Sequence, residues 1–215
     1  MDHIGRYKFS EITFNRLASA GLARLKELPH DIAWSLDPIS KENKVNIRAY
    51  KNKHAGERCF IVANGPSLLK TDLSCLKNEV SFGLNRIYLR FDSTDFRPTY
   101  YVAVNELILE QFSQEIASLK LPKFLNWNRR SYFGTPDRDL LFLKSRLVIQ
   151  DSFQSDLTSP VVFGATVTFA TLQIAFYMGF KTVYLVGLDH NYKEKGTPSK
   201  TETREAEKDE SHFHS

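Results

Sequence analysis

Residues 59–70 read CFIVANGPSLLK, and this stretch decides the fold of the chain. Four apolar residues run into Ala63, Asn64 and Gly65, and Pro66 follows where a helix would begin. Proline suits a first helical position because its missing N–H would have no intrahelical partner there. An apolar run, a tight turn and a helix start in direct succession predict a buried strand of a parallel sheet.

The same alternation of strand, turn and helix continues along the chain. We predict strands at 59–63, 80–85, 99–105, 123–128 and 182–189, with 145–150 as a further candidate. Helices are predicted to start at 66–69 and to cover 106–119 and 166–178, the last stopped by Gly179. This pattern predicts an α/β protein with a Rossmann-like open parallel sheet and helices on both faces.

The segment that precedes the sheet differs in composition. Residues 10–28 carry leucines at helical spacing, which predicts an amphipathic arm that ends near Pro29 and packs on the domain. Residues 36–56 are polar and basic, and we predict a linker with a short strand around VNIRAY. The chain thus divides into an N-terminal helical arm and linker, 1–56, and a Rossmann-like nucleotide-binding domain, 57–215, whose C-terminus is expected to be truncated.

The overall composition is typical of a folded cytoplasmic domain. Apolar residues make up 42% of the chain, and its net charge of +4 is too small to indicate nucleic-acid binding. The two cysteines fit neither a disulfide framework nor a zinc site, and the N-terminus lacks a signal-peptide region. The uncharged stretch 159–180 is nearly long enough to span a bilayer, but its proline, glycines and polar residues favour a helix buried against the sheet.

Polar residues stand at the ends of several predicted strands. Because ligands bind beyond the carboxyl ends of parallel strands, we expect these residues to line one cleft. Asparagine offers a donor and an acceptor without a charge, which suits sugar hydroxyls, a ribose or a base edge. The strand-end residues are Asn64, Gly65, Asn85, Asn105, Gly187 and Asp189.

Two turns predict contacts with a phosphate. Gly65 allows close approach of the backbone, and a helix that begins at Pro66 would direct free N–H groups at a ligand. The sequence Phe163-Gly164-Ala165-Thr166 offers a second start of this kind. Taken alone, either turn also fits ordinary turn chemistry. The G-x-G-x-x-G and P-loop patterns do not occur, so neither NAD binding nor a P-loop kinase is predicted.

The segments IVANGPSL, GLNRIYL, VAVN and FGATVTFATLQIAFYMGFKTVYLVGLD resemble one superfamily in order and spacing. One branch comprises the bacterial sialyltransferases that use CMP-sialic acid. The other is the MptE-like family, named for an archaeal hydroxymethylpterin diphosphokinase. The resemblance covers residues 58–189, and both branches carry the N-G-P-S element.

The resemblance to sialyltransferases implies roles for individual residues. The general base of that family is a histidine within a segment of the type S-H-[FY]…H, which implies His212 or His214 and leaves the choice open. Phe163 stands where that family has a serine. The residues implied to bind the donor are Asn64, Gly65, Pro66, Ser67, Asn85, Asn105, Gly164, Ala165, Gly187, Asp189 and Tyr192.

We therefore predict a nucleotide-sugar glycosyltransferase that uses a CMP-linked donor and a glycan acceptor in surface glycan synthesis. A histidine would take the acceptor proton, and no cofactor or metal is required. The first alternative is MptE-like diphosphoryl transfer from ATP with Mg²⁺, with Asp189 as the leading carboxylate. The second is a catalytically silent nucleotide-binding module. A homo-oligomer and peripheral contact with the inner membrane face are further expectations.

Overall fold

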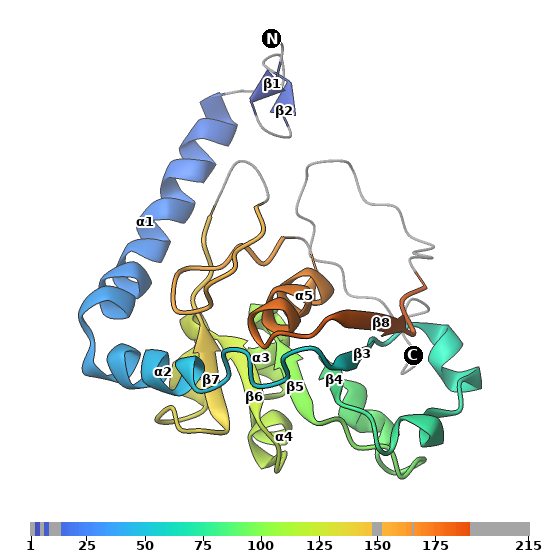
Figure 1. The fold of residues 1–215 in the computed structure, drawn as a ribbon. Coiled ribbons are helices and arrows are strands. Elements are labelled where there is room, and N and C mark those ends of the chain that lie inside the picture. The colour runs from blue at the N-terminus through green and yellow to red at the C-terminus, as the bar shows by residue number, and fades with distance from the viewer. Residues whose placement is uncertain (1–2, 5–6, 9–13, 148–151, 165, 190–215) are drawn as a thin grey trace.

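A computed structural model describes residues 3–4, 7–8, 14–147, 152–164 and 166–189. Its centre is a six-stranded sheet in the order β7-β6-β5-β4-β3-β8, and every pairing in it is parallel (Figure 1). A separate antiparallel pair, β1 (His3–Ile4) and β2 (Tyr7–Lys8), precedes it. The six strands are β3 (Arg58–Val62), β4 (Ser81–Leu84), β5 (Tyr100–Ala103), β6 (Lys123–Asn126), β7 (Leu140–Leu143) and β8 (Thr182–Val186).

Five of these strands lie where the sequence predicts them, and the remaining one does not. Over its described residues, 145–147, the candidate strand at 145–150 does not form, and the fifth strand of the sheet along the chain is the apolar run Leu140–Leu143. Ser145 forms only an isolated bridge with Val161, and residues 148–151 are outside the described part of the chain. The side chains of Leu141, Phe142 and Leu143 are fully buried, so hydrophobic burial explains the position of the strand.

Helices cover both faces of the sheet, as predicted. The registers place Phe82 and Tyr100 on one face, where the ring of Phe82 lies 5.8 Å from that of Phe180, just after α5 (Val167–Tyr177). Tyr101 alternates to the opposite face, where its ring lies 6.5 Å from that of Tyr88 in the 3₁₀ helix η4 (Ile87–Arg90). The other elements after β3 are η2 (Pro66–Lys70), η3 (Leu73–Leu76), α3 (Glu106–Gln111), α4 (Ser113–Ser118) and η5 (Trp127–Tyr132).

The uncharged stretch 159–180 contains α5, which packs on β3, β4 and β5. Ala170, Ile174 and Ala175 are fully buried, and Gly179 ends the helix in the left-handed region at φ 87°. The prediction of a helix buried against the sheet is confirmed. Among the described residues, no helix combines the length and the apolarity that a membrane span requires.

The N-terminal region holds more helix than the sequence predicts. The arm α1 (Phe14–Leu36) continues through Pro29 instead of ending there, and α2 (Pro38–Arg48) replaces the predicted linker and short strand. Asp37 caps α2 by accepting from the Ile39 N–H at 2.9 Å, and Pro38 occupies its first turn. These two features favour a helix start strongly enough to outweigh the polar composition of the segment.

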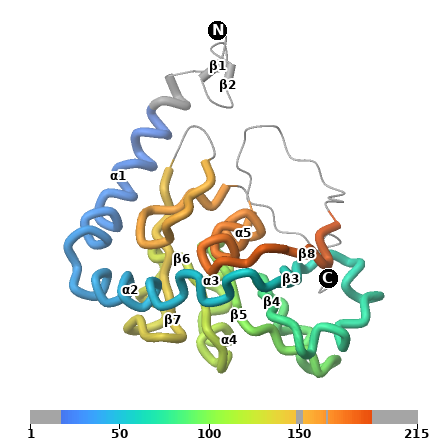
Figure 2. The backbone as a smooth tube through the Cα atoms, in the orientation of Figure 1, coloured from blue at the N-terminus to red at the C-terminus, as the bar shows by residue number. Residues whose placement is uncertain are grey.

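The arm α1 lies along the side of the molecule beyond the β7 edge, as Figure 2 shows. The second half of α1 is held by Trp34, which is buried and makes an edge-to-face contact with Trp127 at 5.1 Å between ring centroids. Most of the large aliphatic side chains of α1, however, are exposed. The helix therefore lies against the domain as expected, but these aliphatic side chains take no part in the contact.

Candidate functional site

The strand order places the switch point of the sheet between β3 and β8. From β3 the chain proceeds strand by strand to β7, and α5 then returns it to the opposite side of β3. In open α/β sheets, ligands bind in the crevice at such a point, beyond the carboxyl ends of the strands. The Gly65 N–H donates to the Gly187 carbonyl at 2.8 Å, so the turns after β3 and β8 touch. The structure thus brings these two predicted segments together.

Asn64 and Asn85, which follow β3 and β4, each carry a buried side-chain oxygen. Asn64 is 5% exposed, and its Nδ2 donates to the carbonyl of Leu84 at 2.9 Å, which ties the end of β3 to the end of β4. Asn85 is the first residue after β4, and its backbone adopts the left-handed conformation, with φ 46°. Within the described part of the chain, neither Asn64 Oδ1 nor Asn85 Oδ1 has a hydrogen-bond partner, although both are buried. A buried acceptor without a donor is costly, so each oxygen is a candidate acceptor for a bound ligand.

The predicted phosphate position at the start of η2 is occupied by the chain itself. The Ser67 N–H donates to Asp189 Oδ2 at 2.7 Å, and the Ser67 hydroxyl donates to the other carboxylate oxygen. These bonds hold the pKa of the Asp189 carboxyl below its usual value. In this conformation the amide that we expected to bind a phosphate is already engaged by a carboxylate.

Gly65 is required by this close approach. A Cβ at position 65 would lie 2.6 Å from Asp189 Oδ2 and 2.6 Å from the carbonyl oxygen of Gly187. The glycine therefore makes room for the chain's own carboxylate, rather than for a ligand as the sequence suggests. Any larger residue would separate the two turns.

Other predicted site residues lie elsewhere or are not described. Asn105 is exposed and caps α3, since its Oδ1 accepts from the N–H groups of Leu107 at 2.9 Å and Ile108 at 3.3 Å. Gly164 adopts φ 61° beside the ring of Phe169. Four predicted site residues fall outside the described part of the chain, namely Ala165, Tyr192, His212 and His214.

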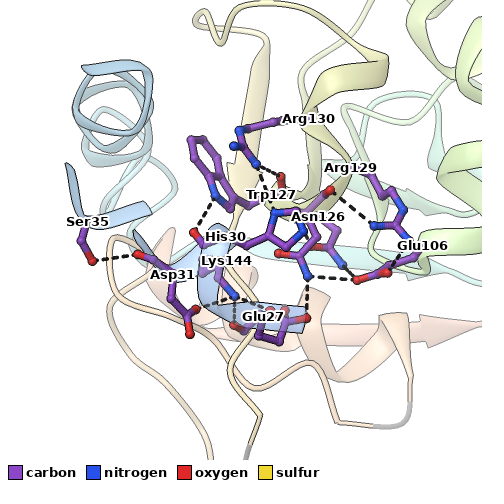
Figure 3. Close-up of polar contacts among 12 residues, drawn as sticks. Glu27, His30, Asp31, Ser35, Glu106, Asn126, Trp127, Arg129, Arg130 and Lys144 are labelled. Carbon is purple, nitrogen blue, oxygen red and sulfur yellow. Dashed lines mark hydrogen bonds and ion pairs between the residues drawn. The ribbon is translucent and has the colours of Figure 1, made fainter. Parts of the chain in front are cut away.

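A second polar cluster occupies the carboxyl ends of β5, β6 and β7, and the sequence did not predict it (Figure 3). The side chain of Lys144 is only 1% exposed, and its Nζ lies 2.7 Å from Glu27 Oε2 and 2.9 Å from Asp31 Oδ1 of α1. Asn128 Nδ2 donates to Glu27 at 2.9 Å and to Glu106 at 3.1 Å. The cluster fastens α1 to the sheet.

The remaining members of this cluster are also paired. Arg129 forms ion pairs with Glu106 at 2.7 Å and Glu110 at 2.5 Å. The His30 carbonyl accepts from Trp127 Nε1 at 3.2 Å, and burial lowers the pKa of the His30 imidazole, which favours its neutral form. The strand-end rule, that functional residues lie just beyond the carboxyl ends of parallel strands, points to Asn128 and Lys144. Their partners in α1, however, lie about a hundred residues away in sequence. In the described ranges no three histidine, cysteine or acidic side chains are grouped so that they could hold a metal ion.

An open parallel sheet with polar residues gathered at its switch point defines an α/β protein of the Rossmann-like class. The sequence matches the family described as 6-hydroxymethylpterin diphosphokinase MptE-like over residues 35–195, and the chain therefore belongs to that family.

Among solved structures, the chain is similar to the MAf glycosyltransferase from Magnetospirillum magneticum AMB-1, with 16% sequence identity and a TM-score of 0.47. The match covers 75% of this chain and 29% of the other, so the chain spans less than a third of that protein. A comparison with curated proteins finds no match.

Proposed function

We propose that the chain is a nucleotide-dependent transferase that holds the nucleoside part of its donor in the switch-point crevice, and that its reaction is glycosyl transfer from a CMP-linked sugar. The observation that carries this proposal is the pair of buried, unpartnered oxygens Asn64 Oδ1 and Asn85 Oδ1. They call for a ligand that donates hydrogen bonds without a charge. The exocyclic amine of cytosine and the hydroxyls of ribose both meet this need.

Asp189 separates this proposal from its main rival. The family description names a diphosphokinase, and diphosphoryl transfer from ATP requires Mg²⁺ and carboxylates free to bind it. Asp189 is the leading carboxylate at the crevice, and both of its oxygens accept hydrogen bonds from Ser67. The carboxamides at the same edge carry no charge and fit a metal-independent nucleoside site better. This contrast favours glycosyl transfer.

In the proposed reaction the acceptor is a glycan hydroxyl, and His212 or His214 removes its proton as the bond to the sugar forms. A histidine suits this step because its ordinary pKa lies near neutral pH. The nucleoside monophosphate departs with the electron pair of the broken glycosidic bond. The proposed setting is surface glycan synthesis.

Ligand-induced thermal stabilisation tests the proposal. We expect CMP to raise the melting temperature without metal, because a ligand at a hundred times its dissociation constant stabilises the fold by about 2.7 kcal/mol. CDP, ATP, and ATP with Mg²⁺ serve as comparisons. Stabilisation by ATP with Mg²⁺ and not by CMP would instead favour the diphosphokinase, and a flat response to all four would contradict both reactions.

The assignment of the base needs a separate measurement of sugar transfer. We expect His212→Ala or His214→Ala to abolish turnover of a CMP-sugar while CMP still stabilises the chain. If both variants turn over normally, neither histidine is the base. The proposal of a nucleoside site is tested separately by CMP binding and does not depend on that result.

A further inference from the structure

One face of α1 is apolar and points away from the domain. At 100° per residue, five exposed aliphatic positions fall within an arc of about 120° on the side of the helix opposite Trp34. We call this face the α1 stripe. Its members, with their exposed fractions, are Leu22 (55%), Leu25 (66%), Leu28 (51%), Ile32 (52%) and Leu36 (70%).

The inner side of α1 explains why the stripe faces outward. Trp34 is the one large apolar residue of α1 that is buried among those whose burial is described, and it packs on Trp127. The other inward contacts are polar, and Glu27 and Asp31 bind Lys144. Polar contacts thus orient the helix, and the hydrophobic face that its sequence encodes lies without a partner within the described chain.

We propose that the α1 stripe is an interface with α1 of a second copy of this chain, in an antiparallel pair across a two-fold axis. Leu25, Leu28 and Ile32 have the alternating spacing of three and four residues that packs helices into one another. An isologous contact of this kind closes as a dimer. This inference is independent of the nucleotide site.

Charges on one flank of the stripe are arranged for such a pair. Arg24 and Asp31 lie on the same side of α1, seven residues apart and of opposite sign. In an antiparallel pair each Arg24 comes beside Asp31 of the partner subunit, whose side chain also binds Lys144 of its own chain but is 55% exposed. A lipid surface would instead favour a flank rich in lysine and arginine. Arg24 and Lys26 flank the stripe and only Asp31 offsets them, so the spacing of the stripe, more than its charge, favours a second helix over a membrane.

The surface beside this flank is recessed. A cavity of about 430 Å³ lies between α1 and residues 144–147, and Leu28, Leu147 and Pro160 form part of its lining. Leu147 is itself 49% exposed. Burial of the stripe and this rim in two copies gives roughly 1,000 Å², which reaches the lower bound for a specific interface. On one copy the patch is about half of this, roughly 500 Å², which is in the range of the largest patches on monomeric proteins.

Sedimentation velocity on the whole chain tests the dimer. From about 1 μM to about 100 μM, we expect the protein to pass from monomer to dimer. Leu25→Glu and Ile32→Glu should each keep it monomeric over that range, a loss of at least about tenfold in dimer affinity, because each places a charge at the centre of the seam. The matched control is Val45→Glu in α2, since Val45 is 60% exposed and lies outside the stripe.

Circular dichroism melts of each variant check that the fold is intact, which we expect because none of these side chains is buried. A wild-type chain that stays monomeric at about 100 μM would overturn the proposal. So would a dimer that survives both glutamate substitutions, which would point to another face such as β8, where Tyr184 and Leu185 are 46% and 48% exposed. Binding of the monomer to phosphatidylserine-containing vesicles that is lost in Leu25→Glu would also overturn it, in favour of a membrane.

Discussion

At the scale of single residues, two asparagines, at the ends of β3 and β6, make the same contact with the neighbouring strand and differ in the partner of the side-chain oxygen. Asn64 Nδ2 donates to the carbonyl of Leu84 at 2.9 Å, and Asn126 Nδ2 donates to the carbonyl of Val104 at 3.1 Å. Asn126 Oδ1 accepts from the Asn128 N–H, whereas Asn64 Oδ1 is buried without a partner in the described chain. The difference makes Asn64 the candidate for a ligand contact and Asn126 a structural residue.

This comparison yields the first prediction. Asn64→Ala and Asn126→Ala should each lower the free energy of unfolding by about 1–3 kcal/mol, because each leaves a strand-end carbonyl without its donor. Only Asn64→Ala should weaken CMP binding, by at least about tenfold, or about 1.4 kcal/mol. Urea denaturation and isothermal titration calorimetry measure the two effects. Equal affinity for CMP in both variants would remove Asn64 from the site.

The second prediction concerns the bond between Asp189 and Ser67. The hydrogen bonds lower the pKa of Asp189 from its ordinary 3.8, so they stabilise the fold above that pH and cease to do so as the pH falls through the lowered pKa. Asp189→Asn should therefore be less stable than the wild type at neutral pH, and the difference should vanish in acid. Because Asp189 is exposed, we expect less than about 1 kcal/mol.

Denaturation of both proteins between neutral and acidic pH measures this difference, and Ser67→Ala provides the matched partner. If the two residues act through one contact, the effects of Ser67→Ala and Asp189→Asn on stability should be less than additive. Strict additivity at neutral pH would show that the contact contributes nothing in solution.

At the scale of elements, the outer edge of β7 is closed by a side chain of α2. Asn43 is fully buried, its Nδ2 donates to the Phe142 carbonyl at 2.8 Å, and its Oδ1 accepts from the Phe142 N–H at 2.8 Å. One carboxamide therefore takes the place of a neighbouring strand at this residue. Since an open strand edge invites pairing with other chains, the contact also protects the sheet.

The third prediction follows from this contact. Asn43→Ala should lower the free energy of unfolding by about 2–4 kcal/mol, because it leaves a buried N–H and a buried C=O of Phe142 unpaired. Asn46→Ala, the same change one helical turn along α2, should alter it by less than about 0.5 kcal/mol. Chemical denaturation of the two variants gives the comparison. Similar losses would mean that the alanine change acts on the helix and not on the strand edge.

The elements also show what the sequence can and cannot predict. The apolar run CFIVA locates β3 because most of that strand is buried, which leaves a continuous hydrophobic signal. The run VYLVG also locates β8, but this edge strand is largely exposed in the structure and is not buried on both faces. The helix α2 escapes prediction because the segment PISKENKVNIR has few apolar residues, and its stability depends on Asp37 and on contacts with β7. Local patterns predict elements, and tertiary contacts decide between them where the pattern is weak.

At the scale of the whole molecule, the sequence predicts which turns form the candidate site but not which hydrogen bonds join them. The strand-end rule predicts that Asn64 and Asp189 share an edge of the sheet, and the structure places their turns in contact. It cannot predict that Asp189 fills the expected phosphate position at Ser67, since these residues lie 122 positions apart. Nor can it place α1, because Lys144 and Glu27 are separated by 117 positions.

The last prediction concerns this long-range link between α1 and the sheet. Lys144→Met should lower the free energy of unfolding by about 3–5 kcal/mol, because it leaves Glu27 partly buried beside Asp31 without their common cation. The loss should be concentrated in α1. We expect hydrogen exchange of the α1 amides to accelerate, while exchange in β3 to β6 stays protected.

A second substitution distinguishes the ion pair from simple packing. Glu27→Leu in the Lys144→Met background should recover much of the lost stability, because an apolar pair of similar volume avoids the cost of burying charge. The recovery should appear both in urea denaturation and in slower exchange of α1. If the double variant is no more stable than Lys144→Met alone, the buried charge is not what holds α1, and the contact between Trp34 and Trp127 becomes the anchor that orients the α1 stripe outward.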